Sequence, residues 1–472
     1  MLFNSFPYIL LFLPVVAVGY VIAARYGGQY FPQAWLLAAS LFFYAYGKPT
    51  DVVLLGSSIV FNWAVGRGLT HLDERRRKLL LQVGLAANIL FLCSFKYINF
   101  FLSSFGGLLG AQLSLPDWRM PLGLSFFTLT QVMYLVDTYQ GLNGPNSLFD
   151  HATFVALFPY VSAGPLVRAR ALLPQFQTVS AGGTRMELAC RGLYLCSLGL
   201  AKKVVLADSF AQIADAGFGT QSHLSTLEAW SASLAYTFQL YFDFSGYSDI
   251  AVGSAWLLGI DIPQNFNAPY RSKSISEFWQ RWHISLSNFI TNYLYTPILR
   301  SMGSATLRTS AVATLLAMGI AGLWHGPAWT FLIFGLLHGA GLSANQIWKK
   351  KKMKMPDWLG WLVTFVFLNI SFVYFRSPNV GSAQRMLMAM LPHSPLASLG
   401  TLRDVLPPLT ASIVLRPVVI GIVAAFWFKS SAELSKSFRP TALTACATAA
   451  LVLLSLVFIN STAAKPFVYF AF

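Results

Sequence analysis

Long segments that are apolar and almost free of charge are the feature that most constrains this chain. From Thr309 to Trp348 the sequence contains no Asp, Glu, Lys or Arg, and apolar runs recur from Tyr8 to the end of the chain. A helix that spans a membrane needs about 20 apolar residues. Hydrophobic residues make up 56% of the 472 residues and charged residues only 11%, a composition typical of membrane proteins. We therefore expect an all-α, polytopic membrane protein with a single domain over residues 1–472.

Most of these runs are apolar on every side, as expected for helices that face lipid or protein all round. The first run, Pro7 to Ala24, has no basic residue before it, so it is expected to be a retained helix rather than a cleaved signal. The predicted spans are 7–24, 31–46, 52–66, 80–104, 120–137, 187–207, 227–242, 246–260, 309–325, 329–347, 358–375, 413–428 and 441–459.

Short basic clusters between the apolar runs account for much of the formal charge of +16. They are better explained as topology signals than as a nucleic-acid surface, and they place Arg75–Lys78, Lys349–Lys354 and Lys429–Arg439 in the cytoplasm. Both termini are then expected outside. The middle of the chain must therefore cross an even number of times, yet seven spans are predicted there. Either one segment fails to span, or the Pro- and Gly-broken stretch Ala152–Val167 adds a partial or full crossing.

His325 lies inside the apolar run that contains "GIAGLWHGPAWTF". An ionisable group at membrane depth is costly and usually faces a functional cavity, so a functional role is favoured over simple packing. Gly326 and Pro327 follow at once, and the position before a proline disfavours helix, so the helix should break just past the histidine. For His338, beside Gly339 and Gly341, a close helix crossing is the favoured role.

The segment Pro263–Ile298 is polar and aromatic rather than uniformly apolar. Ser274 and Glu277 have capping-box spacing, which predicts a helix along the membrane surface or at its cytoplasmic mouth. His283 lies in this segment. Taken alone, it is most simply an interfacial histidine hydrogen-bonded to backbone or water.

The stretch "YFDFSGYSD" places Asp243 and Asp249 in an apolar region, with a possible helix break at Ser245 and Gly246. Two interpretations compete. The carboxylates could pair with Arg271 or Arg281 and hold a cavity wall together, which we favour, or they could move protons. Lys202 and Lys203, at a predicted helix end, are expected to extend their amines toward the interface. The four cysteines lack metal-ligand spacing, and no metal site is predicted.

At these residues the sequence resembles a known family. "FWQRWHISLSNF" (278–289), followed by "GLWHGPAWTF" (322–331), is similar to the paired signature of the membrane-bound O-acyltransferases. "YFDFSGYSDIAVG", "NFNAPYRSKSISEFW" and the amino-terminal helix around Leu11–Val16 are similar to the bacterial branch. That branch includes the alginate and cellulose O-acetylation proteins and the D-alanyl transferase acting on teichoic acids.

The resemblance implies about 11 to 13 helices around a central funnel, with a signature core over about 120–347. It implies that His325 is the buried catalytic histidine and His283 the second signature residue. Candidates for lining the funnel or contacting substrate are Trp282, Asn288, Trp324, Arg281 and Ser285, and Asp243 and Asp249 remain structural carboxylates. The stretch Ser377–Leu415 matches no known pattern.

A neutral histidine can accept the proton of a hydroxyl that attacks a thioester, so His325 is the predicted general base, with His283 positioning the donor. We expect no bound cofactor, and acetyl-coenzyme A or an acyl carrier protein as donor. The acceptor is expected to be an exported polysaccharide, reached directly or through a periplasmic acyltransferase or relay partner. The expected location is the bacterial inner membrane. Two rival hypotheses are a proton-coupled transporter and a scaffold of a polysaccharide secretion complex without chemistry of its own.

Overall fold

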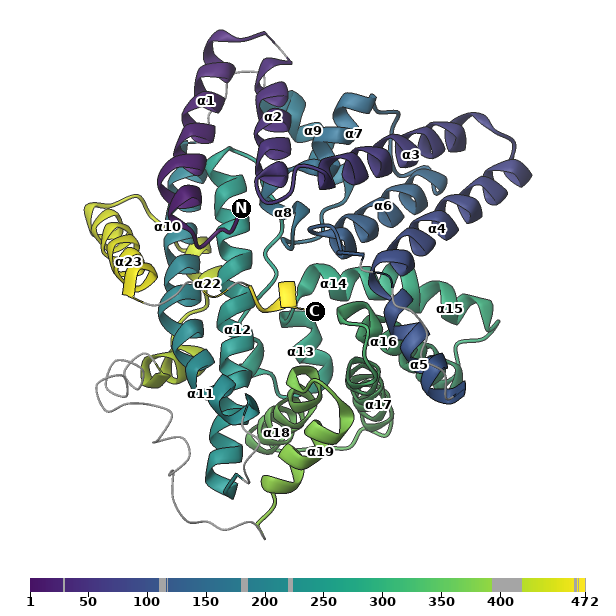
Figure 1. Ribbon diagram of the computed structural model, residues 1–472, viewed down its shortest axis with the longest axis vertical. Helices are drawn as coiled ribbons and strands as arrows, with labels where there is room; N and C mark the ends of the chain where they lie inside the picture. Colours follow the sequence, from purple (N-terminus) through teal and green to yellow (C-terminus); the bar gives the residue numbers. More distant parts are fainter. Residues whose placement is uncertain are drawn as a thin grey trace. The chain divides into compact units, whose positions relative to one another are not determined.

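The computed structural model describes residues 1–28, 30–109, 116, 118–179, 186–219, 224–392, 418–461, 465 and 467–471. Every regular element in this part of the chain is helical, and none of these residues lies in a strand. The predicted all-α class is confirmed (Figure 1). The chain divides into two compact units: unit 1 contains residues 1–196 and 250–263, and unit 2 contains 197–249 and 264–472. The single domain over 1–472 stays a prediction.

Unit 1 is a set of packed helices with hydrogen bonds between buried side chains of neighbouring helices. Helices α3, α4 and α6 lie side by side (Figure 1). Between α3 and α4, the amides of Asn62 and Asn88 donate to each other at 3.2 and 2.7 Å, as buried amides must when no water is near. The elements are η1 (Pro7–Phe12), α1 (Leu13–Tyr26), α2 (Phe31–Ala45), α3 (Asp51–His71), α4 (Glu74–Lys96), α5 (Ile98–Leu109), α6 (Leu124–Tyr139), α7 (Leu148–Ala156), α8 (Phe158–Val161), α9 (Ala169–Val179) and α10 (Met186–Leu200), which runs into unit 2.

The stretch Ala152–Val167 is broken, as its prolines and glycine predict. Helix α7 ends at Ala156. Helix α8 is a single turn that begins at Phe158, with Pro159 next to it. The predicted span 80–104 is also interrupted, at Tyr97 between α4 and α5.

Unit 2 carries both signature segments. Its elements are η2 (Ala201–Ala207), α11 (Asp208–Gly219), α12 (Thr226–Leu257), η3 (Pro269–Arg271), α13 (Ile275–Arg281), α14 (Ile284–Phe289), η4 (Ile290–Tyr295), α15 (Thr296–Ser301), α16 (Leu307–His325), α17 (Trp329–Lys350), α18 (Asp357–Arg376), α19 (Val380–Ala389), α22 (Ser431–Lys436), α23 (Ala442–Ser461) and η5 (Val468–Ala471). The last residues of α12 belong to unit 1. Of the predicted span 413–428, residues 418–426 are helical and 413–417 lie outside the described residues.

The predicted helix break at Ser245 and Gly246 is wrong, because α12 runs unbroken from Thr226 to Leu257. Gly246 serves close packing instead. A Cβ there would lie 2.7 Å from the carbonyl oxygen of Gly199 and 2.9 Å from the amide nitrogen of Lys203, so only glycine lets the two backbones come this close. One continuous helix therefore takes the place of the two predicted spans 227–242 and 246–260.

Helices α16 and α17 form a close antiparallel pair. A Cβ on Gly335 would lie 2.3 Å from the carbonyl oxygen of Met318, and one on Gly322 would lie 2.3 Å from that of Phe331. Small residues at these positions let the helices pack backbone to backbone, as in many membrane helix pairs.

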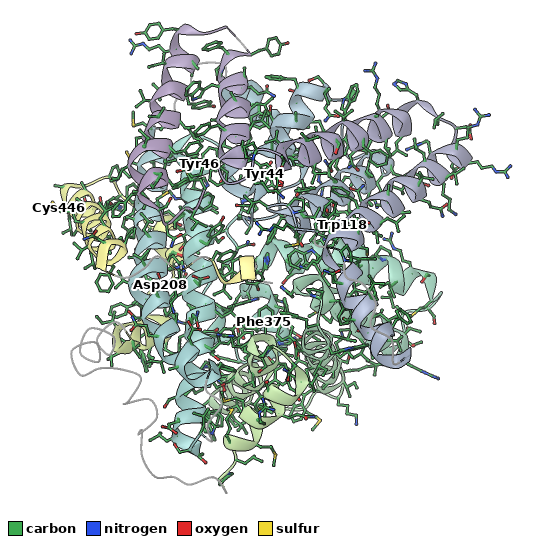
Figure 2. The ribbon with its side chains drawn as sticks, in the orientation of Figure 1. Tyr44, Tyr46, Trp118, Asp208, Phe375 and Cys446 are labelled. Atoms are coloured by element: carbon green, nitrogen blue, oxygen red, sulfur yellow. The ribbon has the colours of Figure 1, made fainter. Side chains whose placement is uncertain are left out.

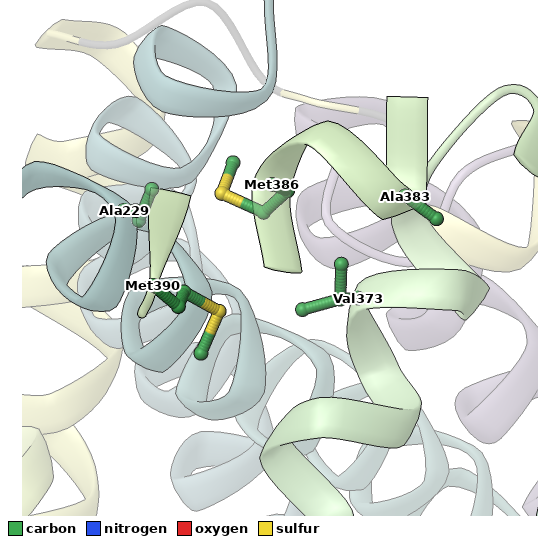
Figure 3. Packing of buried hydrophobic residues seen from close by; sticks show 6 residues of the cluster. Ala229, Val373, Ala383, Met386 and Met390 are labelled. Atoms are coloured by element: carbon green, nitrogen blue, oxygen red, sulfur yellow. The ribbon is translucent and has the colours of Figure 1, made fainter. Parts of the chain in front are cut away.

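At the end of α18 a small apolar core joins three helices. Ala229 of α12, Val373 of α18 and Met386 of α19 are all buried there (Figure 3). Burial of these side chains fixes α18 against α12.

Six helices in the described part of the chain are long and apolar enough to cross a membrane, by length and composition. They confirm a multi-pass membrane protein. They are Pro7–Tyr26, Asp51–His71, Glu74–Lys96, Leu307–His325, Asp357–Arg376 and Ala442–Asn460.

Candidate active site

His325 is the last residue of α16, and the helix ends where the Gly-Pro pair predicts. Gly326 is extended, with φ −164° and ψ 153°, and the chain turns into α17 at Trp329. Only 5% of His325 is exposed. Its ring lies 5.0 Å from that of Trp324 and 5.2 Å from that of Phe375, at the end of α18 (Figure 2). The aromatic walls hold the imidazole away from bulk water.

His283 sits at a sharp turn between two short helices, not within the single helix that the sequence pattern predicts. Ser274 caps α13, accepting from the amide of Glu277 at 3.2 Å, as predicted. The helix then stops at Arg281, and His283 adopts φ 41° and ψ 55°. A left-handed conformation is costly for a residue with a side chain, and such strain is often retained at functional sites. Asn265 supports the turn by accepting from the amides of Ile284 and Ser285, both at 3.0 Å.

The backbone hydrogen bond expected of an interfacial His283 is not found among the described residues, and the residue is completely buried. Neither ring nitrogen has a hydrogen-bond partner among the described residues. Its ring meets the edge of Phe244 at 4.6 Å. Burial lowers the pKa of His283 to about 3, so the imidazole is neutral at physiological pH. Burying a polar ring without hydrogen-bond partners is costly. Such a ring is suited to binding a substrate that enters the site.

Two aromatic rings lie between the signature histidines. The ring of Phe244, from α12, contacts that of His283, and Tyr469, from η5, lies 5.4 Å from the ring of His325. Phe244 and Tyr469 are themselves 4.5 Å apart. The histidines thus share one aromatic cluster without contacting each other directly.

The other candidate residues are distributed around this cluster. Trp282 is buried and stacks on Phe278 at 5.4 Å. Ser285 is buried beside Asn265. Arg281 turns away to form an ion pair with Glu277 at 2.9 Å.

Asn288 lines a separate cavity of about 380 Å³ beside the signature helices. Its walls combine apolar residues with uncharged polar ones, which include Ser276, Gln280 and Ser287 from α13 and α14. Neither signature histidine is among its lining residues. Asn288 therefore does not share this cavity with His283, although the two residues are close in the sequence.

His338 has a structural position that ties three helices together. Trp279 of α13 donates to its Nδ1 at 3.2 Å, and its Nε2 is 3.0 Å from the hydroxyl oxygen of Ser371 on α18. An Nδ1 that accepts requires the proton on Nε2. This arrangement fixes the signature helix α13 against α17 and α18.

The expected pairing of Asp243 and Asp249 with Arg271 or Arg281 is wrong. Lys203 lies 2.5 Å from Asp243 and 2.9 Å from Asp208, and Lys202 lies 2.7 Å from Asp249. Lys203 is only 2% exposed, so it does not extend to the interface. The close approach at Gly246 explains these pairs, because it brings η2 directly against α12.

Tyr469 is the residue near the histidines that the sequence does not reveal, and Lys203 is the residue whose burial it does not predict. The amide of Val468 donates to the second carboxylate oxygen of Asp243 at 2.8 Å, which holds η5 against the site. The aromatic run "FVYF" at 467–470 was an available signal. A contact with residues more than 140 positions earlier is not visible in it, however.

Comparison with known proteins identifies the family of this chain. The family model for membrane-bound O-acyltransferases matches residues 74–384. A peptidoglycan O-acetyltransferase of Helicobacter pylori is 37% identical, covering 100% of this chain and 98% of the relative. A probable alginate O-acetylase of Pseudomonas aeruginosa is 36% identical over 83% of this chain and 75% of the relative. A teichoic acid D-alanyltransferase of Streptococcus thermophilus is 28% identical over 54% and 68%. The chain therefore belongs to the membrane-bound O-acyltransferase family.

Proposed function

We propose that this protein moves an acetyl group from a cytoplasmic thioester to a hydroxyl of a polysaccharide outside the inner membrane, directly or through a periplasmic relay partner. Peptidoglycan is the proposed polymer. The peptidoglycan O-acetyltransferase aligns with the whole chain, whereas the probable alginate O-acetylase aligns with 83% of it. The donor is acetyl-coenzyme A or an acetylated carrier protein.

The observation that carries the proposal is the enclosure of His325 at the interrupted end of α16. In the proposed reaction its neutral imidazole takes the proton of the acceptor hydroxyl while the oxygen attacks the carbonyl carbon. The carbon–sulfur bond then breaks, and the leaving thiolate takes the proton back from the imidazolium. No covalent enzyme intermediate is needed, because holding both substrates together supplies much of the acceleration.

His283 acts in this proposal as a positioning group. Its two unpartnered ring nitrogens can offer one donor and one acceptor to the polar groups of the acyl donor. The strained turn and the bonds from Asn265 hold the ring in place before substrate arrives, which reduces the ordering that binding requires.

The test uses purified full-length protein, donor labelled in the acetyl group, and soluble acceptor glycan. We expect free thiol and acetylated glycan from wild type and from the control variant His71→Ala, which changes an exposed histidine at the end of α3. His325→Ala should yield neither product. Translocated substrate with the thioester intact would favour the transporter. Normal transfer by His325→Ala would overturn the mechanism.

The polymer is tested separately in the host. Mass spectrometry should show that peptidoglycan fragments lose their acetyl groups when the protein is deleted and regain them with the wild-type gene. Unchanged peptidoglycan with loss of acetyl groups from another polymer would contradict the proposed acceptor but leave the acyl-transfer chemistry standing.

A further inference from the structure

A groove at the end of the α17–α18 pair is unrelated to the histidines. It has a volume of about 460 Å³, and we call it the Lys349 groove. On α17 its lining residues Gly341, Ala344, Asn345 and Trp348 follow the spacing of one helical face. On α18, Gly360, Val363, Thr364 and Phe367 repeat the same spacing. The groove thus runs between two facing helical stripes for about two turns, or ~10 Å.

Small residues let the walls of this groove come close together. A Cβ on Gly341 of α17 would lie 3.1 Å from the ring of Phe367 on α18, and one on Gly360 would lie 2.7 Å from the carbonyl oxygen of Lys273. Apolar residues predominate along its walls, with Ser274, Asn345 and Thr364 as polar lining residues. Val363 and Met353 are about half exposed, at 52% and 48%. An apolar channel open to the side suits a hydrocarbon chain in a membrane helix pair.

The end of the groove is positively charged. Lys349 lines it, and Lys350, Lys351 and Lys352 follow directly. Among the ion pairs formed by described residues, none involves these four lysines. The one acidic lining residue, Asp357, is already paired with Lys273. The mouth therefore carries an uncompensated positive charge.

The backbone at the mouth is held in a defined shape. The amide of Met353 donates to the carbonyl of Trp348 at 3.3 Å, and that of Lys352 to the carbonyl of Lys349 at 3.1 Å, the pair of bonds that closes many helix ends. Glycine usually occupies the left-handed position of this motif, but here it is Lys352, with φ 53°. The turn brings Met353 back to the groove beside Trp348.

We propose that the Lys349 groove binds an anionic phospholipid, with the headgroup phosphate at Lys349 and one acyl chain between α17 and α18. Trp348 and Trp358 stand at the two ends of the lysine-rich loop, as aromatic residues do at the headgroup level of membranes. Basic pockets between membrane helices are recognised sites for anionic headgroups. An acidic protein segment would satisfy the lysines but would leave the apolar stripes uncovered, so a lipid fits the whole groove better.

The test is lipid retention by the full-length protein, purified in neutral detergent and delipidated. Phosphatidylglycerol and phosphatidylcholine are added at matched concentrations, and bound lipid is counted by native mass spectrometry. Wild type should retain one phosphatidylglycerol in preference to phosphatidylcholine. Lys349→Gln should weaken that binding about fivefold, since a lysine near an anionic headgroup contributes on the order of 1 kcal/mol.

Two further variants make the outcome specific. Lys350→Gln removes the same charge from a neighbour that does not line the groove, and its affinity should stay within about twofold of wild type. Ala344→Phe fills the groove at an exposed position without changing charge, and it should abolish retention with a normal size-exclusion profile. Equal loss in both lysine variants, retention by Ala344→Phe, or no preference for phosphatidylglycerol would overturn the proposal. Competition by a protein would overturn it as well. That outcome is an acyl carrier protein that binds at Lys349 and displaces phosphatidylglycerol from the wild-type protein.

Discussion

Removing charges from the buried network of Lys203, Asp208 and Asp243 should show how much this network stabilises the fold. Lys203 is 2% exposed and lies between two carboxylates, with Nζ 2.5 Å from Asp243 and 2.9 Å from Asp208. Asp243 also accepts from the amide of Val468 at 2.8 Å. Breaking a buried ion pair so that a charge is left without a partner costs roughly 3 to 5 kcal/mol.

The two single substitutions should differ in size. Lys203→Met leaves Asp208 and Asp243 buried without their cation, so the full cost of about 3 to 5 kcal/mol is expected. Asp243→Asn leaves Lys203 with Asp208 and an amide oxygen in place of the carboxylate. It should cost less, about 1.5 to 3 kcal/mol, the range for hydrogen bonds to charged groups. In the double variant the Asp243 substitution should cost less than it does alone, because no lysine is left for it to pair with.

The assay is the temperature at which half of the detergent-solubilised protein is lost from the monodisperse size-exclusion peak, with acyl transfer measured on the surviving fraction. The control is Lys350→Met, which removes the charge of an exposed lysine at the end of α17. We expect lower midpoints for both Lys203→Met and Asp243→Asn, with near-normal activity per folded molecule. A wild-type midpoint combined with abolished transfer in Asp243→Asn would refute the structural role and make the carboxylate part of the chemistry.

Four further predictions concern the histidines and the topology. His325→Ala should lower the transfer rate by about 10² to 10⁴ with an unchanged size-exclusion profile; a near-normal rate in steady-state assays would contradict the general-base role. His283→Ala should reduce transfer less severely and raise the KM for the donor, and an unchanged KM would argue against donor positioning. Burial lowers the folded-state pKa of His283 from 6.5 to about 3, so the full stability of the folded protein is present above pH 6.5, where the ring is neutral in both the folded and the unfolded chain. That stability is lost as the pH falls from 6.5 toward 3. Wild type should therefore lose thermal stability over this window more steeply than His283→Gln, and parallel pH profiles would count against it. Cysteines placed at Arg76 and Lys351 should resist an impermeant thiol reagent in intact cells; labelling from outside would reverse the topology.

Local sequence signals predicted local structure well. The Gly-Pro pair after His325 marked the end of α16, and Ser274 with Glu277 marked the start of α13. Each of these signals acts within a few residues, through a cap or a steric clash. They therefore do not depend on the rest of the fold.

The signals failed where distant backbones meet. Gly246 resembled a helix break, because glycine is unfavourable in helices and no single sequence shows which backbone lies against it. The same limit hid the partners of Asp243, since arginines nearer in the predicted segment were equally plausible on charge alone. Tyr469 could not be placed beside His325 for the same reason. The pairing of the two signature segments was inferred from family resemblance rather than from physical periodicity.

The buried lysine–carboxylate pairs have a consequence for how the protein enters the membrane. A lone lysine or aspartate at the centre of an inserting helix costs about 2.5 to 3.5 kcal/mol on the translocon scale. Lys202 and Lys203 are synthesised well before Asp243 and Asp249, on different helical segments. On the earlier segment Lys203 can pair with Asp208, but Lys202 lacks its partner Asp249 until α12 emerges from the ribosome. Insertion of the α10–η2 segment should depend on α12 being present, so a nascent chain stopped before Asp243 should remain accessible to the insertion machinery rather than released into lipid.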